Sequence, residues 1–190
     1  MSQSHIEEGL EAVAQVAIAS KGLSAQVARL ATRYAEVLRT GGTLYFCGNG
    51  GSAADAQHVA AEYVVRYSAN RRPLAAAALT TDSSVLTATG NDLAFEQIFA
   101  RQVEALCGPG DLLVLHSTSG QSANLLAAAR SAKQSGVAAV AFLGKGGGAL
   151  ATLVDEAIIV PSHQTSLVQL IHMAFEHLIV ESVERELFGA

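Results

Sequence analysis

Four side chains that could do chemistry recur along one predicted helix, residues 53–67. Asp55, His58, Glu62 and Arg66 follow one another at intervals of three, four and four residues, so they lie on one face of a helix. His58 and Glu62 are one turn apart and can reach one point in space, where they could bind a metal ion or move a substrate proton. A solvated helix face would carry similar residues. The alanines around them favour a small, buried helix, in which charged groups usually have a function.

Two polar loops have the composition of anion-binding sites. Residues 48–52 contain three glycines, which allow a sharp turn and a close approach to a ligand, and end in Ser52, a favourable N-cap for the next helix. Residues 117–122 offer four hydroxyls and a helix start, without Lys or Arg. Free N–H groups at helix starts bind anions. An ordinary serine-rich cap would explain one such loop, but two favour a site for a phosphomonoester.

The last predicted helix carries polar residues on an otherwise apolar segment. Gln169, His172, Glu176 and His177 are more than a core needs. Gln169 and His177 are separated by about 12 Å along a helix at ~1.5 Å per residue. They are therefore not expected to meet at one point from one straight helix. If both serve one site, we expect one of them to come from a neighbouring subunit.

Strands and helices alternate after an N-terminal pair of helices. Residues 5–40 predict two antiparallel helices, separated by Lys21-Gly22, whose remaining apolar face suits a subunit interface. The later elements are strand 43–47, helix 53–67, strand 74–79, a short helix to about 89 ended by 90–92, helix 93–106, strand 112–116, helix 123–134, strand 137–143, a short helix to 153, strand 156–160 and helix 165–187. Five nearly continuous apolar strands between helices predict an α/β fold with a parallel, doubly wound sheet.

The 190 residues fit a single domain. Ligands of such sheets bind beyond the carboxyl ends of the strands, where loops 48–52, 80–84 and 117–122 fall.

Composition excludes several classes of function. A net charge of −5 without a basic run argues against nucleic acid. No apolar run approaches the roughly 18 residues of a membrane span, and residues 1–8 do not fit a signal peptide. Two isolated cysteines, Cys47 and Cys107, indicate reduced thiols in a cytoplasm, and Cys47 is expected to be a small core residue. The hydrophobic content of 50% predicts that some surface is buried against other subunits.

These residues resemble the sugar isomerase (SIS) domain family, and within it the D-sedoheptulose 7-phosphate isomerases, or phosphoheptose isomerases. The similarity covers nearly the whole chain. Its motifs are Gly48-Asn49-Gly50-Gly51-Ser52, Asp55-Ala56-Gln57-His58, Glu62, Gly90-Asn91-Asp92, Ser117-Thr118-Ser119-Gly120 with Ser122, and Gln169 with His172 and His177. The resemblance implies one SIS domain over residues 1–190, a flavodoxin-like three-layer sandwich. It also implies a homotetramer with active sites between subunits, in which the helices of residues 1–40 pack.

The resemblance also implies a reaction and its residues. The reaction is the isomerisation of sedoheptulose 7-phosphate to D-glycero-D-manno-heptose 7-phosphate through a cis-enediol, with Glu62 as the base and His177 as the acid. One zinc ion per subunit would be bound at His58, Glu62, Gln169 and His177. The positions that match substrate contacts are Asn49, Gly50, Gly51, Ser52, Glu62, Arg66, Asn91, Asp92, Ser117, Thr118, Ser119, Ser122 and Gln169.

The sequence departs from the family around Gln169. Where the family usually has Arg-Ile-Gln-Glu, this chain has Leu167-Val168-Gln169-Leu170, so an Arg and a Glu are replaced by leucines. Two non-catalytic alternatives remain: a DiaA-like factor that binds the replication initiator DnaA, and a regulatory SIS protein that binds sugar phosphates. DiaA-like factors lack the catalytic glutamate, whereas Glu62 is present here. Regulatory SIS domains usually accompany a second module, which this sequence does not contain.

Overall fold

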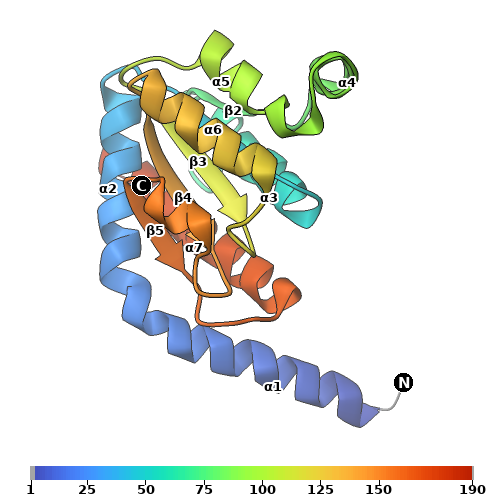
Figure 1. The fold of residues 1–190 in the computed structure, drawn as a ribbon. Coiled ribbons are helices and arrows are strands. Elements are labelled where there is room, and N and C mark those ends of the chain that lie inside the picture. The colour runs from blue at the N-terminus through green and yellow to red at the C-terminus, as the bar shows by residue number, and fades with distance from the viewer. Residues whose placement is uncertain (1–2, 190) are drawn as a thin grey trace.

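A computed structural model describes residues 3–189, which form one parallel five-stranded sheet with helices on both faces (Figure 1). The strands are β1 (Leu44–Gly48), β2 (Ala76–Ala78), β3 (Leu112–Ser117), β4 (Ala138–Leu143) and β5 (Glu156–Ile159). The long helices are α1 (Gln3–Ser20), α2 (Ser24–Arg39), α3 (Gly51–Val64), α4 (Ser83–Asp92), α5 (Ala100–Leu106), α6 (Ala123–Gln134) and α7 (Thr165–Phe188). Short 3-10 turns are η1 (Lys21–Leu23), η2 (Phe95–Gln97) and η3 (Ala149–Thr152).

The strand order is β2-β1-β3-β4-β5, and each neighbouring pair is parallel. The chain passes from β1 to β2 on one side and returns to β3 on the other, so the order reverses between β1 and β3. This arrangement confirms the predicted flavodoxin-like α/β sandwich.

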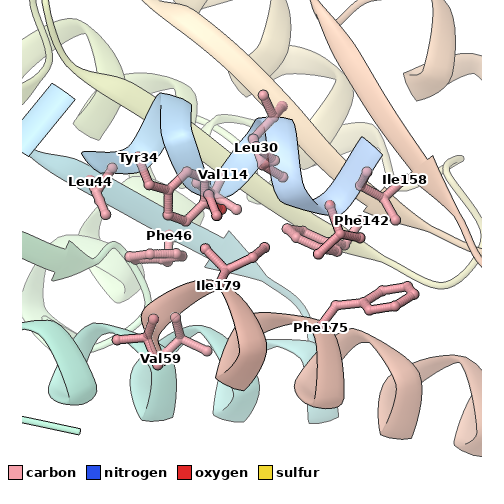
Figure 2. Close-up of a cluster of buried hydrophobic side chains, with 14 of the residues drawn as sticks. Leu30, Tyr34, Leu44, Phe46, Val59, Val114, Phe142, Ile158, Phe175 and Ile179 are labelled. Atoms are coloured by element: carbon pink, nitrogen blue, oxygen red, sulfur yellow. The ribbon is translucent and has the colours of Figure 1, made fainter. Parts of the chain in front are cut away.

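Alternate residues of the strands face two separate cores. Phe46, Val114 and Phe142 pack beneath α2, α3 and α7, as Figure 2 shows. Leu113 and Leu115, one residue out of step, face α5 and α6 on the opposite side. Both faces of the sheet are therefore covered, as the continuous apolar strands predicted. Cys47 is fully buried in the second core, and both cysteines are free thiols.

The N-terminal helices do not form the predicted antiparallel pair. The chain bends at η1, and α1 extends outward from the N-terminal end of α2 (Figure 1). Most of α1 is exposed; Ile6, Leu10 and Ile18 are each more than half exposed. The Lys21-Gly22 break was predicted correctly, but three residues of 3-10 helix turn the chain without reversing it.

The region of residues 80–106 also differs from the prediction. Gly90-Asn91-Asp92 does not end the short helix, because α4 runs to Asp92. The Asp82 carboxylate caps this helix by accepting from Val85 N–H at 3.0 Å. A single glycine costs a helix only about 1 kcal/mol, which the cap helps to offset. The predicted helix 93–106 is interrupted instead, since Ala94 is extended and only residues from Ala100 onward are α-helical.

Candidate active site

The loops after β1 and β3 meet at a pocket of about 240 Å³. Gly48 and His116 are register partners in the sheet, so the loops that follow them leave it side by side at the reversal of strand order. The lining residues are Asn49, Gly51, Ser52, His116, Ser117, Thr118, Ser119, Ser122, Thr165 and Gln169. The structure thus brings together most of the predicted phosphate-binding residues.

Three helices begin at this pocket. Gly51 opens α3, Ser122 is the N-cap of α6 and Thr165 opens α7, and all three line the cavity. Each helix start carries partial positive charge on its N–H groups. None of the lining residues is Lys or Arg, so an anion here would be held by backbone N–H groups and hydroxyls.

Ser52 is not the N-cap of α3, contrary to the prediction. The N-cap is Gly50, whose φ of 56° is a conformation that favours glycine, and α3 begins at Gly51. Ser52 lies in the first turn, where its buried hydroxyl accepts from Gln169 Nε2 at 3.3 Å. This bond joins the start of α3 to α7.

The serine loop holds its own shape. Ser117 Oγ accepts from Gly120 N–H at 3.0 Å, and Ser119 Oγ accepts from Gln121 N–H at 3.3 Å. Gly120 has φ of 63°, and a Cβ there would lie 1.8 Å from the carbonyl oxygen of Gly147. The glycine-rich loop 144–148 therefore packs directly against the serine loop.

Asn124 is a residue that the sequence reasoning missed. Its side-chain amide and that of Asn49 bond to each other reciprocally, at 2.9 and 2.8 Å, and Asn124 is buried. The pair fixes the first loop against α6. The position of Asn124 in the first turn after Ser122 could have indicated a functional amide, but nothing in the sequence indicated that it bonds to Asn49.

A second cluster lies farther along α3 and α7. His58 Nε2 is 3.3 Å from Glu62 Oε1 and 3.0 Å from His177 Nε2. One ligand atom from each of the three residues lies within 4.8 Å of the others. Two imidazole nitrogens and a carboxylate oxygen are donors that suit zinc, whose bonds to such atoms are about 2.0–2.2 Å long.

Gln169 and His177 serve different ends of α3. Gln169 contacts Ser52 at the helix start, whereas His177 contacts His58 two turns later. His177 reaches the His58–Glu62 pair within one chain, so this contact needs no second subunit. The structure places three of the four predicted metal ligands together, and directs the Gln169 side chain toward Ser52 and Gly51.

Five predicted substrate contacts lie outside the pocket lining: Gly50, Glu62, Arg66, Asn91 and Asp92. Asn91 and Asp92 are exposed at the end of α4 and bond to each other. Arg66 lies two residues beyond the end of α3 and is exposed. The helix face that carries Asp55, His58 and Glu62 therefore does not extend to Arg66, because α3 ends three residues before its predicted end.

A buried polar layer lies behind the pocket. His116 Nε2 is 3.0 Å from Glu176 Oε1, and both side chains are fully buried. His172 is also buried, and its Nε2 is 3.1 Å from the carbonyl oxygen of Leu143. Burial, reinforced by the nearby His116, lowers the pKa of His172 to about 3, so His172 is neutral at pH 7.

Comparison with known proteins agrees with this geometry. The model of the SIS domain family matches residues 10–144. A phosphoheptose isomerase from Roseiflexus sp. is 52% identical over 162 residues, covering 85% of this chain and 82% of the relative. Another, from Bradyrhizobium sp. (strain BTAi1), is 47% identical over 184 residues, covering 97% and 92%. This chain belongs to the phosphoheptose isomerase family.

Solved structures of the phosphoheptose isomerase family have the same fold. GmhA from Neisseria gonorrhoeae has a TM-score of 0.91 at 35% identity, covering 96% of this chain and 98% of that one. A phosphoheptose isomerase from Francisella tularensis has a TM-score of 0.92 at 34% identity, covering 97% and 99%. The match includes the N-terminal helices as well as the sheet. Within residues 3–189, no helix has the length and apolar character to cross a membrane.

Proposed function

We propose that this chain is an aldose–ketose isomerase that converts D-sedoheptulose 7-phosphate to D-glycero-D-manno-heptose 7-phosphate. The observation that carries the proposal is an anion pocket and an acid–base cluster on the same two helices. Ser52 and His58 are six residues apart on α3, or about 9 Å along its axis. That separation is similar to the length of an extended seven-carbon sugar between its phosphate and its carbonyl group.

The pocket would position the substrate through its phosphate. The starts of α3, α6 and α7 and the hydroxyls of Thr118 and Ser122 surround the cavity, and they match the charge and size of a phosphomonoester. Gln169, which lines this pocket beside Ser52, would bind a sugar hydroxyl. Leu167, which stands where the family usually has Arg, is a core residue like Val168, so this position contributes to hydrophobic packing here.

Glu62 would act as the general base. Its carboxylate would take a proton from C1 of the ketose while His177 protonates the oxygen at C2, which gives a cis-enediol. Return of the proton to C2, with loss of the proton from the oxygen at C1, gives the aldose. The single proton moves between neighbouring carbons, so no external redox partner is needed.

His58, Glu62 and His177 would also bind zinc, one ion per subunit, and the expected fourth ligand, Gln169, would have to turn away from Ser52 to reach the ion. The donor set fits the metal. A bound zinc ion would polarise the two oxygens of the carbonyl and its neighbouring hydroxyl as a Lewis acid. Because Glu62 and His177 cannot bind the ion and transfer protons with the same atoms, they would supply the base and the acid only where those atoms are free of the metal.

We further propose a homotetramer that works in the cytoplasm. The exposed apolar side chains of α1 support the assembly, because an isolated helix seldom leaves three large aliphatic residues in water. Two free thiols support a reducing compartment. Light scattering of the purified protein, with Leu10→Glu expected to dissociate the assembly, tests the role of α1.

The activity is tested by measuring heptose 7-phosphate formation in the presence of zinc. Glu62→Gln should lower kcat at least about 100-fold, since general-base catalysis typically contributes this much. Glu181→Gln, an exposed glutamate of α7 paired with Arg185, is the matched control and should keep wild-type kcat. Absence of turnover by the wild type, together with binding of a replication initiator, would support the DiaA-like alternative. Relatives named phosphoheptose isomerase and the presence of Glu62 do not favour that alternative.

A further inference from the structure

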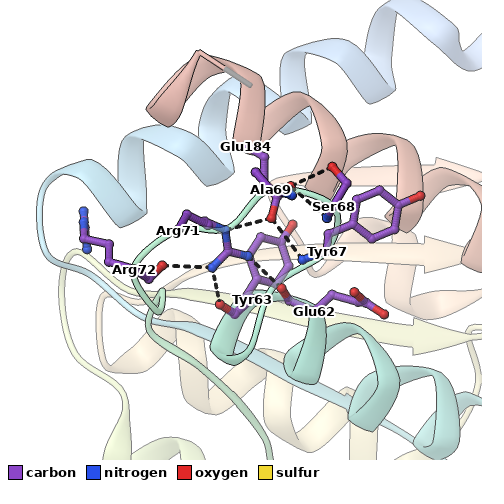
Figure 3. A network of polar contacts seen from close by, with 8 residues as sticks. All are labelled: Glu62, Tyr63, Tyr67, Ser68, Ala69, Arg71, Arg72 and Glu184. Atoms are coloured by element: carbon purple, nitrogen blue, oxygen red, sulfur yellow. Dashed lines mark hydrogen bonds and ion pairs between the residues drawn. The ribbon is translucent and has the colours of Figure 1, made fainter.

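A buried glutamate near the end of α7 organises the segment that follows α3. Glu184 accepts from the backbone N–H groups of Tyr67, Ser68 and Ala69, at 3.0, 3.0 and 2.9 Å. It also accepts from the Ser68 hydroxyl at 3.0 Å and pairs with Arg71 Nε at 2.8 Å. Figure 3 shows these contacts converging on one carboxylate. We refer to Glu184, Arg71 and residues 67–69 as the Glu184 clamp.

Arg71 extends the clamp to α3. Its Nη2 donates to the carbonyl oxygen of Glu62 at 2.7 Å, and its Nη1 donates to that of Tyr63 at 2.8 Å (Figure 3). The last carbonyls of a helix lack partners within it, and a guanidinium satisfies two of them here. The Arg71 and Glu184 side chains are each 1% exposed. The clamp therefore joins the turn of α3 that carries Glu62 to α7.

The clamp also places an aromatic ring on His177. The Tyr67 ring stacks on the imidazole, with centroids 5.6 Å apart and planes at 28°. His58 contacts the imidazole edge-on, with centroids 5.2 Å apart and planes at 67°. His177 is thus held between two rings, one from α3 and one from the clamp. These two ring contacts restrict the side-chain torsions of His177.

We propose that Tyr67, fixed by the Glu184 clamp, is a positioning residue that holds His177 against His58 and Glu62. The proposal rests on the function proposed above, because it assigns Tyr67 to the same reaction. The clamp grips Tyr67 through its backbone N–H, so substitution of the side chain leaves the Glu184 contacts in place. Tyr67 can therefore be tested without dismantling the buried ion pair.

The test compares Tyr67→Phe with Tyr67→Ala. Tyr67→Phe keeps the stacked ring and should retain kcat within about twofold of wild type. Tyr67→Ala should lower kcat about tenfold while KM changes less than about threefold, because the acid is misplaced and the phosphate pocket is intact. Zinc affinity, measured by calorimetric titration, should also fall about tenfold in Tyr67→Ala alone, as it does when the support of a metal ligand is removed.

These measurements separate the two proposals. If the wild type does not isomerise the heptose phosphate, the proposed function fails, and the zinc affinities still decide the role of Tyr67. A crystal structure of Tyr67→Ala adds a third measurement, in which the Nε2 atoms of His177 and His58 should move apart from the present 3.0 Å. Wild-type kcat, zinc affinity and His177 orientation in Tyr67→Ala would overturn the proposal. A loss of activity in Tyr67→Phe equal to that in Tyr67→Ala would overturn it as well, since the hydroxyl and not the ring would then be required.

Discussion

Two buried glutamates on α7 differ in how their charge is satisfied. Glu176 and Glu184 lie eight residues apart on the same helix, and each side chain is 1% exposed. Glu184 receives five hydrogen bonds, one of them from a guanidinium. Glu176 has contacts at one oxygen only, from His116 at 3.0 Å and the Tyr34 hydroxyl at 3.4 Å.

The two glutamates also differ in their buried polar neighbours. Among residues 3–189, Glu176 Oε2, His116 Nδ1 and His172 Nδ1 are buried without a hydrogen-bond partner. All three belong to the layer behind the pocket, whereas the Glu184 carboxylate is satisfied by donors from the segment that follows α3. A buried polar group without a partner costs about 1–3 kcal/mol. We therefore expect the clamp to stabilise the fold and the layer behind the pocket to lower its stability.

Removing the Glu184 carboxylate is expected to have the largest effect. Glu184→Leu leaves the Arg71 guanidinium buried without its ion-pair partner, and three backbone N–H groups lose their acceptor. The free energy of unfolding should fall by about 3–5 kcal/mol, measured by urea denaturation at pH 7. The exposed Glu181→Gln serves as the control and should change stability by less than about 1 kcal/mol. A loss below about 1 kcal/mol in Glu184→Leu would remove the distinction between the two glutamates.

The contribution of Glu184 to the free energy of unfolding should depend on pH. Burial alone would raise the pKa of Glu184, but the N–H groups of Ala69, Tyr67 and Ser68 outweigh it and lower the pKa from 4.5 to about 2. A carboxyl with a lowered folded-state pKa stabilises the protein above its unfolded pKa, and this contribution is lost as pH falls from about 4.5 to about 2. The shift corresponds to about 3 kcal/mol.

Urea denaturation at several pH values between 2 and 7 checks this expectation, with Glu184→Gln as the matched variant. In Glu184→Gln, the free energy of unfolding should fall less steeply with pH below about pH 4.5 than it does in the wild type. The buried neutral His172, with a pKa lowered to about 3, also makes acid destabilising, but from about pH 6.5 downward. Equal slopes below pH 4.5 in wild type and Glu184→Gln would contradict the assignment.

Removing the whole Glu176–His116 pair should cost little stability, in contrast to the loss of the Glu184 carboxylate. Glu176→Leu or His116→Leu alone strands the other partner and should cost about 1–3 kcal/mol. The double variant removes both polar groups and should lie within about 1 kcal/mol of wild type, since apolar replacement of a whole buried pair is often neutral. A double-mutant cycle in urea measures the coupling. Additive losses would show that Glu176 and His116 are not coupled, which would contradict this expectation.

Local patterns of sequence predicted much of the fold and part of the site. The apolar runs around Phe46, Val114 and Phe142 predicted strands covered on both faces, because each run lacks polar alternation. The spacing of His58 and Glu62 predicted one helix face, since a turn of helix takes 3.6 residues. Helix ends were less predictable. A glycine at position 90 is compatible with a helix when a cap such as Asp82 stabilises its start.

The types of group at the site could be read from the amino-acid sequence: two polar loops at strand ends, a His/Glu pair and an apolar helix with extra polar residues. Which of these groups meet depends on the packing of the helices. His177 and His58 are 119 residues apart, and Arg71 and Glu184 are 113 apart; only the packing of α7 on α3 brings each pair together. In sequence, Glu184 is indistinguishable from its exposed neighbours Glu181 and Glu186. Burial and donor geometry separate them, because a carboxylate removed from water must find its hydrogen bonds within the protein.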